Sequence, residues 1–118
     1  LCIDNEPSIL DAMRDLLHRW QCHVLTAHDM VEATQATTDP NVIDLILADY
    51  HLNDGVTGLD VMRELRRSAK QPIPGILITA DQSEKVAEQA ALEGYQILHK
   101  PVEAAALRAL MSQIARQQ

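Results

Sequence analysis

The stretch Leu45-Ile46-Leu47-Ala48 is an unbroken apolar run that stops at Asp49. A short run of this kind is typical of a strand covered on both faces, as strands are in parallel sheets with helices on either side. Gly75-Ile76-Leu77-Ile78 repeats the pattern and is followed by Thr79-Ala80-Asp81. The two stretches predict neighbouring buried strands of a parallel sheet, each ending in polar residues.

The same order of apolar run, polar turn and helix-period stretch recurs along the whole chain, and about five such units fit. Alternating strands and helices imply right-handed crossovers and a doubly wound parallel sheet with helices on both faces. The sequence therefore predicts one α/β domain over residues 1–118. The expected strands span residues 1–3, 23–27, 45–48, 75–78 and 96 to Lys100.

The composition argues against binding to nucleic acid. The 118 residues include 10 Lys and Arg against 17 Asp and Glu, a formal net charge of −7. Binding to a phosphate backbone needs clustered Lys and Arg, and single strands stack on aromatic side chains. Trp20, Tyr50 and Tyr95 are the only aromatic residues. We expect no direct nucleic-acid ligand.

The cysteines and the apolar segments indicate the cellular compartment in which the protein works. Cys2 and Cys22 form no CxxC spacing and are expected to be free thiols. No apolar stretch approaches the roughly 20 residues that span a bilayer, and no signal peptide opens the sequence. We expect a cytoplasmic domain without membrane contact. Leu1 is not Met and lies inside an expected strand, which suggests a segment of a longer polypeptide.

Polar residues follow four of the expected strands: Asp4-Asn5-Glu6, Asp49, Thr79 and Lys100. In doubly wound sheets ligands bind beyond the carboxyl ends of the strands, where the strand order reverses. Acidic side chains gathered there repel one another unless a cation compensates. Mg²⁺ prefers few carboxylates, several waters and a phosphoryl oxygen, which suits such a pocket. Lys100 supplies a second positive charge.

These groups together describe a site for a transferring phosphoryl group: a carboxylate nucleophile, a metal, a lysine and the Thr79 hydroxyl. Asp49 is assigned as the nucleophile because it ends its strand alone, whereas Asp4 and Glu6 belong to a cluster suited to a cation. Taken singly, Asp49 could be a turn former and Lys100 a solvated strand end. Their joint position at one sheet edge favours the phosphoryl site.

The chain resembles the receiver domain of bacterial two-component signalling over essentially its whole length. Four elements in order carry the resemblance: the acidic turn, Asp49, Thr79-Ala80 and Lys100-Pro101. The resemblance implies a flavodoxin-like (βα)5 fold with strand order 2-1-3-4-5. It also implies that Asp49 takes a phosphoryl group, with Mg²⁺, from a phosphohistidine on a sensor histidine kinase or a histidine phosphotransfer protein, and that the acyl phosphate later hydrolyses.

The same resemblance implies roles for the surrounding residues. The side chains of His51 and Asp81 are expected to flank the attacking water and tune hydrolysis. Thr79 is expected to move toward the phosphoryl group as part of a conformational switch that involves position Ile97. The implied Mg²⁺ ligands are Asp4, Asn5, Asp49 and the backbone carbonyl of His51, with Glu6 as a further candidate.

Two positions depart from the family pattern. Asn5 stands where the family usually has a second aspartate, and Ile97 stands where many receivers carry the Tyr or Phe of an aromatic switch. These departures leave open a degenerate receiver that acts by phosphorylation-independent contacts. The runs Ile3–Pro7 and Ala48–Leu52 look most like receivers at the C-terminus of hybrid sensor histidine kinases, whose parent chain would be an enzyme. A stand-alone regulator and a homodimer stay open.

Two other classes fit the sequence less well. An aspartate-nucleophile phosphatase needs its nucleophile after the first strand and another Asp two residues on, where this chain has Glu6. A flavodoxin-like flavin site needs a Gly-rich or Ser/Thr-rich phosphate loop there, and Asp4-Asn5-Glu6 would repel the phosphate.

Overall fold

The computed structural model describes residues 1–116 and has at its centre a five-stranded parallel sheet in the order β2-β1-β3-β4-β5. The predicted doubly wound α/β fold is thereby confirmed. The strands are β1 (Cys2–Ile3), β2 (Thr26–Ala27), β3 (Ile46–Asp49), β4 (Gly75–Thr79) and β5 (Gln96–His99). The helices are α1 (Pro7–Arg19), α2 (Met30–Ala36), α3 (Gly58–Arg67), α4 (Glu84–Leu92) and α5 (Ala104–Arg116).

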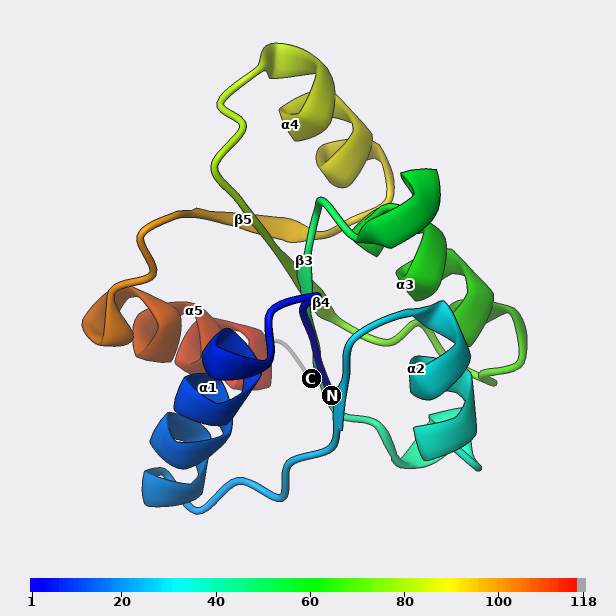
Figure 1. Cartoon of the computed structure of the whole chain (residues 1–118), viewed down its shortest axis with the longest axis vertical. Coiled ribbons are helices and arrows are strands. Elements are labelled where there is room, and N and C mark those ends of the chain that lie inside the picture. The colour runs from blue at the N-terminus through cyan, green and yellow to red at the C-terminus, as the bar shows by residue number, and fades with distance from the viewer. Residues whose placement is uncertain (117–118) are drawn as a thin grey trace.

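Helices cover both faces of the sheet, with α1 and α5 on one side and α2, α3 and α4 on the other (Figure 1). Successive strand residues point to opposite faces, so each central strand feeds two cores. Ile46 and Ala48 belong to the core beneath α2, α3 and α4, whereas Leu47 between them belongs to the core beneath α1 and α5. This two-sided burial is why the sequence of β3 is apolar without interruption.

The second strand is shorter than the predicted span of residues 23–27. Only Thr26 and Ala27 pair with β1, in register with Cys2 and Ile3. The Leu25 carbonyl adds one further hydrogen bond, accepting from the Cys2 N–H at 2.8 Å. β2 lies at the edge of the sheet and β1 offers two paired residues, so the ladder cannot extend to His23.

The ends of the helices follow local sequence signals. Pro7 occupies the first turn of α1, and the Asp29 side chain caps α2 by accepting from the Glu32 N–H. Gly94 has a φ of +79° just after α4, a left-handed conformation that ends the helix without a side-chain penalty. Pro40 begins a short 3-10 turn, Pro40–Val42, rather than ending α2 directly. Among residues 1–116, no helix is long and apolar enough to cross a bilayer.

Candidate functional site

The strand order brings four polar side chains to one edge of the sheet. Asp4 follows β1, Asp49 and Thr79 end β3 and β4, and Lys100 follows β5. The connection from β1 runs to α1 on one face, while the connection from β3 runs to α3 on the other, which opens a crevice between these strands. Residues far apart in the sequence therefore share one site, as the alternating pattern predicted.

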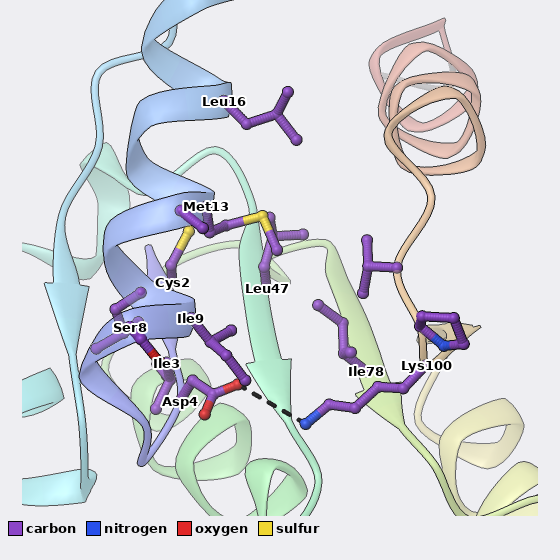
Figure 2. A pocket seen from close by; sticks show the side chains of 14 residues that line it. Cys2, Ile3, Asp4, Ser8, Ile9, Met13, Leu16, Leu47, Ile78 and Lys100 are labelled. Carbon is purple, nitrogen blue, oxygen red and sulfur yellow. Dashed lines mark ion pairs between the residues drawn. The ribbon is translucent and has the colours of Figure 1, made fainter.

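Lys100 bridges the two acids of this edge. Its ammonium nitrogen lies 3.2 Å from Asp49 Oδ1 and 4.0 Å from Asp4 Oδ2; Figure 2 shows the second of these pairs. Asp49 and Asp4 are only 5% and 6% exposed, whereas the Lys100 side chain is 28% exposed. One partly solvated cation thus compensates two nearly buried carboxylates.

Burial dominates the electrostatics of both carboxylates. Loss of hydration raises the pKa of Asp49 above its ordinary value, although the Lys100 charge and hydrogen bond oppose the shift. Burial likewise raises the pKa of Asp4, opposed first by the hydrogen bond that the Glu6 N–H donates to Asp4 Oδ1 at 2.9 Å. Two nearly buried carboxylates share one lysine, so when both are ionised the edge keeps a net negative charge, which favours the approach of a further cation.

The other two residues of the acidic turn differ in position. The Asn5 side-chain amide donates to Asn53 Oδ1 at 3.3 Å and so reaches the loop after β3. The Glu6 side chain is exposed, and within residues 1–116 no three His, Cys, Asp or Glu side chains are close enough to hold a metal together. The nearly buried carboxylates at the edge are therefore those of Asp4 and Asp49, and a role of Glu6 as a metal ligand stays a prediction.

The loop after β3 presents a main-chain oxygen. His51 and Thr57 form an isolated antiparallel bridge. Its hydrogen bonds are made by their neighbours, Leu52 N–H to the Val56 carbonyl at 3.2 Å and Gly58 N–H to the Tyr50 carbonyl at 2.9 Å. This is the wide type of antiparallel pair, in which the paired residues do not bond to each other. The bridge fixes the His51 backbone without using its carbonyl oxygen.

Gly58 is a site residue that the sequence pattern alone did not single out. Gly58 is the first residue of α3, and a Cβ there would collide with the main-chain carbonyl of Asp49. Thr57 and Asp60 form a capping box that starts the helix at this point. The Thr57-to-Asp60 spacing could have indicated this start in the sequence.

A hydrogen bond between Thr79 and Asp81 orders the start of the loop after β4. The Thr79 side chain is fully buried, and its oxygen accepts from the Asp81 N–H at 2.9 Å, so the hydroxyl retains its own proton to donate. The Asp81 carboxylate accepts from the Ser83 N–H at 2.8 Å, and this hydrogen bond lowers the pKa of Asp81. His51 is exposed on the β3 side of the edge, and its positive form adds to the lowering.

Ile97 lies in the middle of β5, paired with Leu77. Its side chain is partly buried and packs against the core beneath α2, α3 and α4. Lys100 is joined to Pro101 by a cis peptide bond. The structure thus places Ile97 in the wall of a core, three residues before the lysine that enters the site.

The chain matches the response regulator receiver domain over residues 1–112 and belongs to that family. It is therefore a phosphoryl-accepting domain of two-component signalling, as the resemblance predicted. No curated protein sequence is significantly similar to it. Receiver domains generally bind Mg²⁺ at the phosphorylation site and take phosphoryl groups from histidine kinases or phosphotransfer proteins.

Solved receiver structures resemble the chain along nearly its whole length. A response regulator receiver domain protein from Clostridium thermocellum is 28% identical with a TM-score of 0.86, and the match covers 98% of this chain and 92% of that one. The Vibrio cholerae chemotaxis protein CheY4 is 20% identical with a TM-score of 0.82, over 96% and 94%. A response regulator protein from Burkholderia pseudomallei is 23% identical with a TM-score of 0.77, over 92% and 62%.

Proposed function

We propose that Asp49 is the phosphoryl acceptor of this receiver domain and that Lys100 and Thr79 assist the transfer. The observation that carries the proposal is the 3.2 Å contact of the Lys100 ammonium with the nearly buried Asp49 carboxylate. A carboxylate that is both desolvated and paired with a single lysine is a poised nucleophile with a cation beside it for the incoming phosphoryl oxygens.

The residues present fit a divalent cation. The donors available are the two buried carboxylates of Asp4 and Asp49, the Asn5 amide and the unused His51 carbonyl, all of them hard oxygen ligands. Mg²⁺ at this edge would neutralise the charge of the phosphoryl oxygens. The Burkholderia pseudomallei structure is described with a phosphorylated aspartic acid and a calcium ion, which supports the same pairing here.

The transfer needs little further chemistry from the protein. A carboxylate oxygen of Asp49 forms a bond to phosphorus while the bond from phosphorus to the donor imidazole nitrogen breaks, and the imidazole takes up a proton. Lys100 compensates the charge of the phosphoryl oxygens, and the Thr79 hydroxyl donates to one of them. A water molecule later attacks phosphorus and restores the Asp49 carboxylate and free phosphate. His51, after β3, and Asp81, after β4, influence how that water is held.

The donor is a histidine kinase or histidine phosphotransfer protein, and we expect the domain to work in the cytoplasm. Two free cysteines, Cys2 and Cys22, are compatible with a reducing compartment. Fusion to a hybrid kinase stays a prediction from the runs around Asp4 and Asp49. Dimerisation likewise stays a prediction.

The test is phosphorylation by a small acyl-phosphate donor with Mg²⁺, followed by intact mass spectrometry. Wild-type protein should gain the mass of one phosphoryl group, and hydroxylamine should remove it, because an acyl phosphate is cleaved by that nucleophile. Asp49→Asn should gain nothing. The matched control is Asp54→Asn, the same change at an exposed residue of the next loop, which should label like the wild type. Labelling of the Asp49→Asn protein would refute the assignment.

The hypothesis of a degenerate receiver keeps one argument, since Asn5 makes the edge less negative than two adjacent aspartates would. The same labelling experiment decides it. A wild-type chain whose mass does not change, under conditions that fully label another receiver, would establish that this chain acts through phosphorylation-independent contacts.

A further inference from the structure

A cavity of about 630 Å³ opens between α1 and the loop that follows β5 (Figure 2). We call it the α1 pocket. Its floor is the sheet, at Cys2, Leu47 and Ile78, and its wall on the helix side includes Ile9, Met13 and Leu16. Pro101 and Val102 form the opposite side. The volume lies in the range of pockets that hold small ligands, roughly 300–1,000 Å³.

Polar side chains lie at one end of the α1 pocket only. We call the end of the sheet where Asp4, Asp49, Thr79 and Lys100 lie the phosphorylation edge. Asp4, Ser8 and Lys100 are the polar lining residues of the pocket, and Figure 2 shows them together at the end nearest this edge. The Lys100 ammonium lies between Asp49, at 3.2 Å, and Asp4, at 4.0 Å, so its charge is not free for an anionic ligand.

Beyond the α1 pocket, the last turn of α1 makes an aromatic contact with α5. One turn beyond Leu16, the partly buried Trp20 ends α1 and packs against the core beneath α1 and α5. The Arg108 guanidinium of α5 lies over its ring, 5.4 Å from the centroid. The α1 pocket thus has the Asp4–Lys100 ion pair at one end and mainly apolar side chains along the rest of its lining.

We propose that the α1 pocket binds a small uncharged molecule that is mainly hydrocarbon and carries one hydrogen-bonding group, directed toward Asp4, Ser8 and Lys100. An apolar body matches the lining, and a neutral polar end can bond to these side chains without separating the ion pair. An anionic head group would meet two nearly buried carboxylates and a lysine already paired with them, and a cationic head group would compete with the Mg²⁺ proposed at Asp4, so neither is the preferred class.

Asp4 and Lys100 belong both to the α1 pocket and to the phosphorylation edge. Occupancy of the pocket therefore changes Mg²⁺ affinity, and Mg²⁺ changes the affinity for the ligand by the same factor. This coupling rests on the proposed function of the edge, whereas binding in the pocket does not. The two claims can be separated by experiment.

The probe is N-phenyl-1-naphthylamine, an uncharged fused-ring molecule with one N–H that fluoresces in apolar surroundings. We expect saturable fluorescence with one probe per chain. Ala12→Trp places a large ring at a lining position of α1 and should weaken binding by about tenfold or more. The matched control is Ala87→Trp, the same change on an exposed position of α4, which should bind like the wild type. Equal binding by the two variants would overturn the proposal.

Two further measurements test the charge of the ligand and the place where it binds. An anilinonaphthalene sulfonate, the same scaffold with a fixed negative charge, should bind at least several-fold more weakly; equal affinity would contradict the neutral class. Amide NMR shifts on adding the uncharged probe should map to α1 and to residues 100–102. Shifts centred on Leu92, an exposed apolar residue of α4, would instead show adventitious surface binding and overturn the site.

The coupling is tested by titrating Mg²⁺ with and without saturating probe. A changed Mg²⁺ affinity supports it, and an unchanged one refutes the coupling. Asp49→Asn separates the two proposals, because the probe should still bind this variant even though it cannot be phosphorylated. Loss of probe binding in Ala12→Trp together with normal phosphorylation would support the pocket as a site distinct from the acceptor.

Discussion

The backbone of Gly58, at the start of α3, approaches the main-chain carbonyl of Asp49 so closely that no side chain fits between them. The helix that covers one face of the sheet is therefore packed directly against the residue that we propose as the phosphoryl acceptor. The position of Asp49 depends on this contact as well as on β3.

Gly58→Ala should lower the free energy of unfolding by about 1–3 kcal/mol and slow labelling of Asp49, because the added methyl group must push α3 or the end of β3 aside. Urea denaturation and the labelling rate measure the two effects. Gly94→Ala is the comparison: that position has open space but a positive φ, so the variant should lose about 1 kcal/mol and label normally. Equal labelling rates would show that the contact does not position the acceptor.

Asp49→Asn should stabilise the metal-free protein near neutral pH. The raised pKa means that the folded chain holds the Asp49 proton more tightly than the unfolded chain. This contribution to stability is complete below the ordinary pKa of 3.8 and is lost as the pH rises through the folded value. Asparagine does not titrate, so the advantage of the variant should shrink on acidification toward pH 3.8. Urea unfolding at several pH values, with a chelator present, measures the difference in stability between the variant and the wild type.

Asp81→Asn should have the opposite effect and lower the stability of the protein near neutral pH. The hydrogen bond from the Ser83 N–H lowers the pKa of Asp81, so the ionised group contributes stability above its ordinary value of 3.8 and loses it as the pH falls through the lower folded value. The variant should be less stable than the wild type at neutral pH in the same unfolding experiment. A gain in stability would contradict the attribution to this hydrogen bond.

Asn5→Asp should tighten Mg²⁺ binding by about tenfold, or about 1.4 kcal/mol, because it adds a carboxylate beside Asp4 and Asp49. Titration calorimetry measures the affinity. Glu6→Gln removes one negative charge from an exposed neighbour and should change the affinity by less than about twofold. A large loss in the Glu6 variant would instead identify Glu6 as a ligand.

Tyr95→Phe should leave the stability unchanged or raise it by up to about 1 kcal/mol. The Tyr95 hydroxyl is buried without a hydrogen-bond partner among the described residues, whereas the ring packs under the Arg66 guanidinium at 4.1 Å. Phenylalanine keeps the ring and removes only the unpaired group. Thermal unfolding is a sufficient measurement. A clear loss of stability would mean that the hydroxyl has a partner, such as an ordered water.

The fold could be predicted because its central strands are buried on both sides, which leaves an unmistakable apolar run at β3 and β4. The same reasoning overestimated β2, since an edge strand leaves a weaker pattern and its length depends on the partner strand. Gly58 could not be recognised as a site residue, because glycine is usually found where the chain is flexible, whereas here it permits close packing against Asp49.

The convergence of Asp4, Asp49, Thr79 and Lys100 also followed from the sequence, since parallel strands end at the same edge. The contacts that these side chains make with one another could not be predicted from the sequence. The closer pairing of Lys100 with Asp49 than with Asp4, the bridge between His51 and Thr57 and the α1 pocket depend on side-chain and loop geometry across long separations in the chain. No local pattern encodes such distances.

The residues of the phosphorylation edge come from the carboxyl ends of four separate strands, which only the assembled sheet brings together. Reactivity toward an acyl-phosphate donor is therefore a property of the entire sheet. A peptide cut from around Asp49 contains the acceptor but neither Asp4 nor Lys100, and should be chemically inert. Covalent labelling can consequently serve as an assay of native structure, since denatured molecules would not be labelled.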